Sequence, residues 1–151
     1  MKARAHSDSA GRQALSVLTD RLRHGARKIT GPRKAILEVL RSHSHPLTNK
    51  QVLAAMPTGQ CDLATIYRAM HLLEKLGMVK RYDFADGKAR FELVPQEGDS
   101  HHHHLVCMRC AHVVEIEECF SGAIERRIAS RNGFKEVTHK LEFFGICPAC
   151  Q

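Results

Sequence analysis

Two Cys-x-x-Cys motifs lie in the second half of this sequence and restrict how that half can fold. Cys107 and Cys110 form the first motif, and Cys147 and Cys150 form the second, with 36 residues between them. Such motifs supply the thiolates of closed tetrahedral zinc sites; buried thiols that merely pack are the alternative. Because the gap is longer than in a simple zinc ribbon, we expect a small domain to fold between the two halves of one structural zinc site.

A run of four histidines, residues 101–104, immediately precedes the first motif. Imidazoles suit zinc, iron, copper and nickel. In an extended strand alternate side chains face opposite sides, so His102 and His104 share one face while His101 and His103 share the other. A flexible, metal-binding tract without a fixed structure is the alternative. The pattern predicts that one segment contributes to a structural metal site and to an exchangeable one.

The composition limits the class of protein. Hydrophobic residues make up 43% of the 151 residues, which is enough for a core. The sequence has neither a long apolar run nor a signal-peptide pattern, so we expect a soluble, cytoplasmic protein without a membrane partner. With no export signal, the paired cysteines favour metal binding over a disulfide scaffold.

Charge is distributed unevenly along the chain. Residues 1–94 contain 17 lysines and arginines against 8 acidic residues, whereas residues 95–151 contain 6 against 8. A basic first half joined to a slightly acidic second half that is rich in cysteine and histidine suggests a nucleic-acid-binding domain followed by a metal-binding domain. A merely solvated basic surface is the alternative.

Helical periodicity dominates the first half. Residues 1–11 are small and polar, and we expect them to be disordered. Apolar spacing predicts helices over residues 12–24 and 32–43. Thr48 followed by Gln51 forms a capping box, which predicts a short helix that ends before Pro57.

The next predicted helix has the features of a DNA-recognition helix. Asp62 can cap it, and Gly77 stands where a left-handed C-cap belongs. Thr65, Tyr67 and Arg68 lie near its N-terminus, from which side chains of a recognition helix reach base edges. Its opposite, apolar face would be buried. An ordinary solvated helix face is the alternative. The apolar residues are Leu63, Ile66, Met70 and Leu73.

A hairpin follows this helix. Residues 78–84 and 89–94 alternate in polarity around an Asp-Gly pair, which is a hairpin signal. Helices that end in a basic hairpin predict a winged helix-turn-helix domain over residues 1–94. Basic side chains of the hairpin would lie along DNA phosphates. These side chains are Lys80, Arg81, Lys88 and Arg90.

The remaining segments predict a second, smaller domain. Residues 95–100 contain Pro and Gly and are expected to form a hinge. The second domain, residues 101–151, is expected to contain strands at 105–108, 113–117 and 136–144 and a helix at 121–132. A small sheet with an exposed edge often pairs with its own copy, so we expect a symmetric homodimer. The predicted fold class is α+β, with a winged helix-turn-helix domain and an α/β dimerisation domain.

These motifs together resemble the ferric uptake regulator (Fur) family of bacterial metal-responsive repressors. The resemblance spans roughly residues 12–150. It implies an N-terminal winged helix, a C-terminal dimerisation domain and metal-dependent binding to palindromic DNA operators. The matching segments are residues 30–33 (Thr-Gly-Pro-Arg), 62–68, 90–93, 101–110 and 145–150.

The resemblance also assigns roles to individual residues. It implies a structural Zn2+ on the cysteines of the two motifs, base contacts by Tyr67 and Arg68, and a minor-groove contact by Lys28. It implies a sensing site formed by Glu92, His102 and His104. His45 is the nearest candidate for a further sensing ligand from the DNA-binding domain.

An accessory site is implied on the other histidines. His101, His103 and His139 match it, whereas the usual helix acid falls on Gly122. Glu118 or Glu125 would have to replace that acid. Peroxide-sensing relatives combine carboxylates with the same histidines, and Glu115 can complete such a set.

The function expected from this resemblance is repression of iron or zinc uptake genes, with Fe2+ or Zn2+ as regulatory metal and Mn2+ as a further candidate. A peroxide-sensing repressor and a metal-buffering protein are the alternatives. An enzyme is not expected, because the sequence lacks a His-Glu-x-x-His motif and a Gly-rich phosphate loop.

Overall fold

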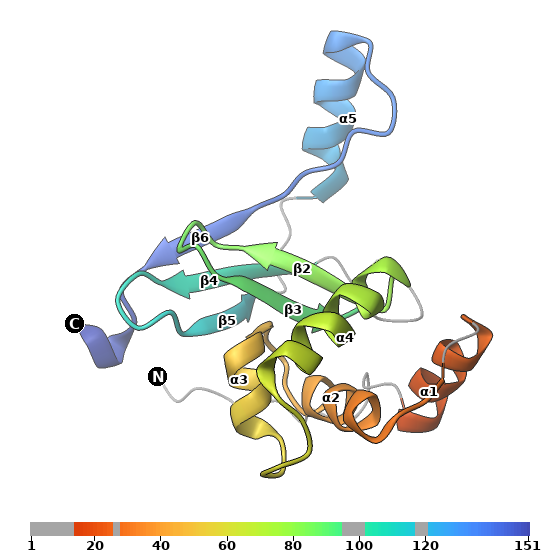
Figure 1. Ribbon diagram of the computed structural model, residues 1–151. Helices are drawn as coiled ribbons and strands as arrows, with labels where there is room; N and C mark the ends of the chain where they lie inside the picture. Colours follow the sequence, from red (N-terminus) through yellow and green to blue (C-terminus); the bar gives the residue numbers. More distant parts are fainter. Residues whose placement is uncertain (1–13, 26–27, 95–101, 117–120) are drawn as a thin grey trace. The chain divides into compact units, whose positions relative to one another are not determined.

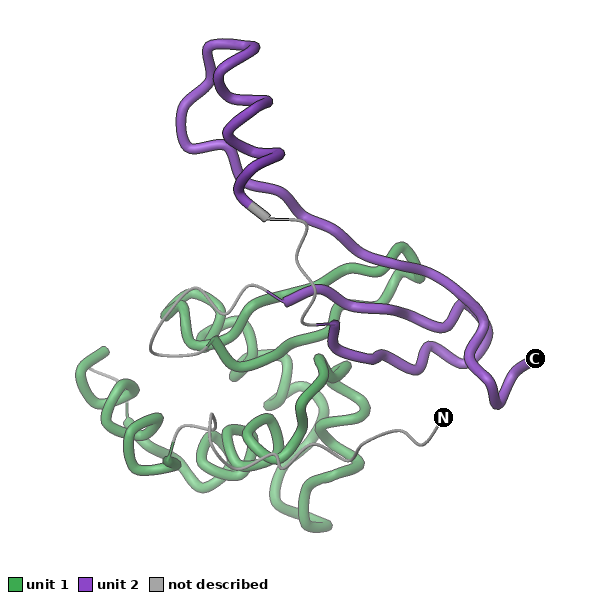
Figure 2. Tube along the Cα trace, turned by 180° about the vertical axis from the view of Figure 1, so that it is seen from behind, with its two compact units in different colours: residues 1–98 green, residues 99–151 purple. Residues whose placement is uncertain are grey.

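The computed structural model describes residues 14–25, 28–94, 102–116 and 121–151 (Figure 1). The chain divides into two units, residues 1–98 and 99–151 (Figure 2). The segments predicted to be disordered (1–11) and to form a hinge (95–100) lie outside the described residues. The expected α+β class is confirmed, because helices and a small antiparallel sheet form the first unit and a second sheet forms the other.

The helices of the first unit agree closely with those expected from the sequence. Within the described residues, no helix is both long enough and apolar enough to cross a membrane. The helices are α1 (Leu15–His24), α2 (Gly31–Arg41), α3 (Asn49–Ala55) and α4 (Leu63–Lys75).

Polar caps explain where α3 and α4 begin. The Thr48 hydroxyl accepts a hydrogen bond from the Gln51 N–H at 3.2 Å, and the Gln51 side chain accepts one from the Thr48 N–H at 2.9 Å. This confirms the capping box that starts α3. The Asp62 carboxylate accepts a bond from the Thr65 N–H at 2.7 Å and starts α4. Gly77, just past α4, has φ +63, a conformation that glycine adopts without strain.

The capping box yields a first prediction. Thr48→Ala removes the acceptor of an N-terminal N–H of α3, and should lower the free energy of unfolding by about 1 kcal/mol. Urea denaturation followed by circular dichroism measures this change. Thr58→Ala, in an exposed turn, is the matched control and should have little effect. Equal losses for the two variants would contradict the stabilising role of the cap.

The wing sheet has the strand order β1-β3-β2, in which all neighbours are antiparallel. Its strands are β1 (Leu47–Thr48), β2 (Val79–Asp83) and β3 (Ala89–Leu93). The hairpin of β2 and β3 confirms the predicted wing. The sequence did not predict β1, since two residues are too few to show alternation. Leu47 pairs with Phe91 in this strand and is buried.

A single apolar core holds α1 to α4 and the wing together. Burial of each large aliphatic side chain stabilises the fold by about 1.5–3 kcal/mol. The apolar face of α4 belongs to this core, so its opposite face is left exposed at a fixed orientation. Fully buried members of the core include Leu18, Leu22, Ile36, Leu37, Val52, Ile66 and Leu73.

The second unit contains a sheet in the order β5-β4-β6. Strand β4 is antiparallel to β5 and parallel to β6. Helix α5 projects away from this sheet (Figure 1). The elements are β4 (His103–Cys107), β5 (Val113–Ile116), α5 (Ser121–Asn132), β6 (Glu142–Gly145) and the 3-10 helix η1 (Pro148–Cys150).

The third strand of this unit is shorter than predicted. The sequence indicated a strand over residues 136–144, but β6 begins only at Glu142, which pairs with His104. Glu136 has φ +54, so the backbone there is left-handed and not extended. The intervening residues 137–141 have no strand partner among the described residues, and all of them except Lys140 line a cavity beside α5.

Candidate metal centres and DNA-reading surface

Both Cys-x-x-Cys motifs form tight turns at the same end of the second sheet. The parallel strands β4 and β6 both finish at this end, so each strand leads directly into one motif. In the first turn the Ala111 N–H donates to the Cys107 carbonyl at 2.9 Å. In the second the Cys150 N–H donates to the Cys147 carbonyl, also at 2.9 Å. The predicted domain between the two halves of the site is therefore present.

The four thiols of these turns meet. Their sulfur atoms lie within 4.8 Å of one another, and Cys110 Sγ is 3.6 Å from Cys147 Sγ. That separation is too long for a disulfide bond, which needs about 2.05 Å. Sulfur ligands of a tetrahedral zinc at about 2.3 Å lie roughly 3.8 Å apart, which agrees with the geometry. The four-cysteine cluster is therefore consistent with structural zinc.

The electrostatics of the cluster also favour a cation. Backbone N–H groups of Cys110 and Cys147 point at Cys107 and lower the pKa of its thiol to about 5. Hydrogen bonding to the thiols of Cys147 and Cys110 raises the pKa of Cys150 to about 12. Thiolates this close repel one another, so the metal-free cluster cannot ionise fully. A divalent ion removes this repulsion and fits the donor set.

One face of β4 carries imidazoles next to carboxylates. The rings of His102 and His104 are 5.0 Å apart and nearly perpendicular, as expected for alternate residues of a strand. His102 Nδ1 lies 3.6 Å from Glu115 Oε1. Glu115 on β5 and Glu142 on β6 are the register partners of His104 on its two sides. Sequence reasoning missed Glu142, because only the parallel pairing of β6 brings it to this face.

The opposite face of β4 carries a second cluster. His103 Nδ1 lies 3.1 Å from the Leu141 carbonyl, His139 Nδ1 lies 2.8 Å from Glu125 Oε1, and the two Nε2 atoms lie 3.3 Å apart. A carbonyl and a carboxylate only accept, so each Nδ1 carries a proton. In neutral rings both Nε2 lone pairs then face each other. Nitrogen ligands of a tetrahedral zinc also lie roughly 3.3 Å apart, so this cluster fits a divalent metal.

Some candidate metal ligands do not lie beside the residues with which the sequence grouped them. Glu115 had been grouped with the accessory histidines but lies beside His102, on the other face of the sheet. Glu125, one of the two candidates for the helix acid, contacts His139. His101 and Glu118 lie outside the described residues.

Further candidate ligands belong to the first unit. Glu92 lies on β3, where it pairs with Lys80. His45 is half-buried in the loop between α2 and β1, and its ring is 5.7 Å from that of His43.

Helix α4 exposes the side chains expected to read DNA. Tyr67 is 55% exposed, and Arg68 is exposed beside it. Arg68 Nη2 donates to the Thr65 hydroxyl at 3.0 Å. Bonds from the Thr65 hydroxyl and N–H lower the pKa of Asp62, which keeps this carboxylate ionised. The cap of α4 therefore orients Thr65, and Thr65 orients Arg68.

Other exposed basic residues lie before and after this helix in the sequence. Lys28 is exposed before α2, and Lys80 and Arg81 are exposed on β2. The sequence predicted that Arg90 would lie along DNA phosphates, but its side chain makes contacts within the wing. Its guanidinium forms an ion pair with Asp86 at 2.7 Å and its side chain is only 3% exposed, so it is already engaged within the wing.

Comparison with known proteins identifies the family. The protein-family model described as the Ferric uptake regulator family matches residues 24–144 of this chain. The ferric uptake regulation protein of Legionella pneumophila is 38% identical over 136 residues, which cover 88% of this chain and 98% of that protein. The solved Vibrio cholerae ferric uptake regulator is 31% identical, with a TM-score of 0.68 over 86% of this chain and 99% of that chain. The structure of a zinc-bound manganese uptake regulator is 30% identical, with a TM-score of 0.71 over 89% and 99%.

The match covers both units and includes the reading helix α4, strand β4 with its histidines, and the first cysteine motif. Members of this family regulate transcription and are not enzymes. The chain therefore belongs to the ferric uptake regulator family, and is a metal-responsive, DNA-binding regulator of transcription.

Proposed function

We propose that this protein is a cytoplasmic repressor that binds palindromic operators as a homodimer when its sensing site holds a metal, and that it controls iron or zinc uptake genes. The observation that carries this proposal is the arrangement of β4. This one strand, together with His102 directly before it, supplies Cys107 to the thiolate cluster, His102 and His104 to one face, and His103 to the other. A structural site and exchangeable sites are thereby connected through a single short element.

We assign the sensing site to His102 and His104, completed by Glu92 and His45 from the first unit and assisted by Glu115. Zinc or iron bound there would supply a cation that these neutral imidazoles and carboxylates share. Because these ligands come from both sides of the hinge predicted at residues 95–100, we expect them to restrict the orientation of the first unit when they bind one metal together. Differential affinity for the DNA-binding orientation then sets the size of the response.

We assign an accessory site to His103, His139 and Glu125, with His101 as a further ligand. Support comes from the geometry, because each Nδ1 has its own hydrogen-bond partner while the two Nε2 atoms lie 3.3 Å apart. The hydrogen bonds at Nδ1 also orient the rings, as partners of metal-bound histidines commonly do.

Dimerisation is supported by the surface of α5. Ile124 and Ile128 are 43% and 46% exposed, and with Val137, Leu141 and Phe143 they line a cavity of about 320 Å³. An apolar surface of this kind on a helix that projects from its own sheet needs a cover in water. A second copy of the chain would provide it and would match the two-fold symmetry of a palindromic operator.

The identity of the regulatory metal calls for a direct test. The Legionella relative is named for iron and the similar solved structure for manganese and zinc, and nitrogen and oxygen ligands accept all three. We propose Fe2+ or Zn2+, with Mn2+ as the next candidate. Operator binding measured against buffered free Fe2+, Zn2+, Mn2+ and Ni2+ tests the function. Metal uptake without any metal-dependent DNA binding would instead identify a metal-buffering protein.

Peroxide sensing within the same family is the second candidate, because Glu115 places a carboxylate 3.6 Å from His102 Nδ1. Under that alternative, hydrogen peroxide should release the Fe2+-loaded protein from DNA and add oxygen to His102 or His104. Mass spectrometry detects this addition. Unchanged DNA binding and an unchanged mass would exclude the peroxide-sensing role.

Base reading by α4 yields a second prediction. Arg68→Ala should weaken operator binding by about 1–3 kcal/mol if its guanidinium contacts a base edge. Binding to random DNA should change much less. Lys75→Ala, which removes an exposed charge from the last turn of the same helix, is the matched control. Equal losses on operator and random DNA would assign Arg68 to the phosphate backbone instead.

A further inference from the structure

The wing tip contains an ion pair between Asp86 and Arg90, two side chains that lie four residues apart in the sequence and meet through two hydrogen bonds. Arg90 Nη1 lies 2.9 Å from Asp86 Oδ1, and Arg90 Nη2 lies 2.7 Å from Asp86 Oδ2. Parallel bonds between a guanidinium and a carboxylate fix the relative orientation of both groups. The pair therefore links the turn of the hairpin to strand β3.

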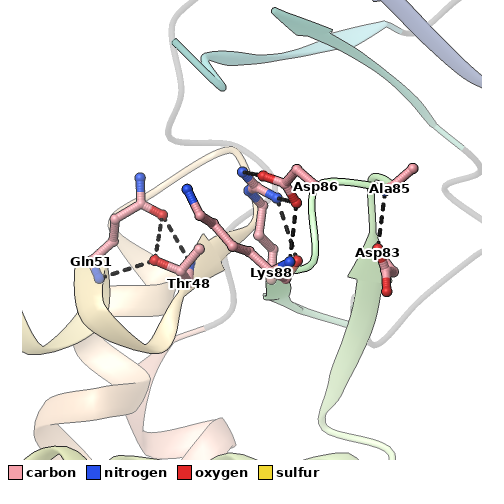
Figure 3. A network of polar contacts seen from close by, with 7 residues as sticks. Thr48, Gln51, Asp83, Ala85, Asp86 and Lys88 are labelled. Atoms are coloured by element: carbon pink, nitrogen blue, oxygen red, sulfur yellow. Dashed lines mark hydrogen bonds and ion pairs between the residues drawn. The ribbon is translucent and has the colours of Figure 1, made fainter. Parts of the chain in front are cut away.

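The same two side chains hold the backbone of Lys88. The Lys88 N–H donates to Asp86 Oδ1 at 3.2 Å, and Arg90 Nη1 donates to the Lys88 carbonyl at 3.4 Å (Figure 3). Both polar backbone groups of Lys88 thus bond to one ion pair. Its side chain is exposed, so the charged amine remains available at the tip.

The turn needs such support because its backbone is left-handed at two places. Ala85 has φ +60 and Gly87 has φ +69. For a residue other than glycine this conformation is strained, because Cβ comes too close to the following carbonyl oxygen. The Asp83 carboxylate accepts a bond from the Ala85 N–H at 3.0 Å and stabilises the first position. The ion pair stabilises the part of the turn that follows Gly87.

Charge gives the pair a second effect. An unpaired carboxylate at a wing tip would repel DNA phosphates. Hydrogen bonding to Arg90 lowers the pKa of Asp86 to about 2, so the carboxylate stays ionised and paired wherever DNA binding is measured. Arg90 also lies 5.3 Å above the Phe84 ring and pairs in register with Thr48, the cap of α3. The strand that holds the tip is therefore connected to the helix-turn-helix.

We propose that Asp86 and Arg90 form a clamp that presents the Lys88 amine to a DNA phosphate, and that Arg90 is a positioning residue and not itself a phosphate ligand. This inference rests on the proposed DNA binding. It extends that proposal by naming the residues that give the wing tip its shape.

A double-mutant cycle on the metal-loaded, full-length protein tests the clamp. Lys88→Ala should weaken binding to operator and random DNA by similar factors and reduce the slope of log affinity against log salt by about 0.9. Arg90→Gln should cause a comparable loss, although it removes no phosphate contact. In the Arg90→Gln background, Lys88→Ala should then have little further effect. Arg68→Ala, on the reading helix, should keep its full effect in that background and serves as the control.

Amide hydrogen exchange without DNA provides an independent readout. In Arg90→Gln the Lys88 N–H should exchange faster, while amides in α2 and α4 keep the protection of the parent protein. Arg90→Lys retains the charge but not the two-point geometry, and serves if Arg90→Gln does not fold. Additive losses for Lys88 and Arg90, or unchanged exchange at Lys88, would overturn the clamp. A parent protein that binds no DNA would overturn the proposed function, while exchange would still test the clamp.

Discussion

Cys147→Ser should remove about one zinc ion per chain and unfold or loosen the second unit. Its sulfur lies 3.6 Å from that of Cys110 within the four-thiol cluster, and a closed site that loses a ligand binds zinc far more weakly. Zinc binding at structural sites contributes about 10–16 kcal/mol in small zinc domains, and that energy is also folding energy. We therefore expect this to be the largest effect of any single substitution considered. Metal analysis and light scattering measure zinc content and dimerisation.

Cys61→Ser is the matched control for this experiment. Cys61 lies in the first unit, where its sulfur is 3.8 Å from Met56 Sδ, and the same change there should leave zinc content and dimerisation unaltered. If Cys147→Ser retains its zinc and remains a stable dimer, the four cysteines do not form the structural site.

His102→Ala combined with His104→Ala should abolish the metal-induced gain in operator affinity and leave the fold intact. The rings of His104 and of His102, which directly precedes β4, lie close together near the start of that strand, whereas the four thiols meet at its other end. The thiolate site should therefore keep its zinc. Coupling between effector and DNA sites is typically about 1–3 kcal/mol, which is the expected loss. Operator affinity with and without added metal measures the loss, and zinc content is determined on the same samples.

The opposite face of β4 provides the control. His101→Ala combined with His103→Ala alters the same strand by the same chemistry, but His103 contacts His139 and not Glu115. We expect a smaller change in the metal response. A His102 and His104 variant that responds fully to metal would place the sensing site elsewhere.

Local sequence signals predicted much of the first unit correctly. Thr48 with Gln51 and Asp62 with Thr65 form the expected caps because such bonds involve residues three positions apart. The alternation of the histidines also depended only on neighbouring residues and the geometry of a strand. Features of this kind are independent of how distant segments pair.

The features that sequence reasoning missed depend on pairing between distant segments. Glu142 reaches the face of His104 only through the parallel register of β4 and β6. Arg90 was expected on DNA phosphates because its charge is visible in the sequence, whereas its ion pair with Asp86 depends on the shape of the turn. The contact of Glu125 with His139 depends on the rotation of α5, which the local sequence does not show.

On the proposed assignment, the alternation of the histidines along β4 would make metal selectivity depend on the register of this strand. A slip of one residue would exchange the two sets of imidazoles, so that His103 faced Glu115 while its neighbours turned toward His139. Cys107 ends the strand and is bound into the thiolate cluster, which resists such a slip. A zinc ion bound by the four thiols would therefore also fix the register of the histidines. On the proposed assignment, losing that ion would change which imidazoles each metal meets, even in molecules that still fold.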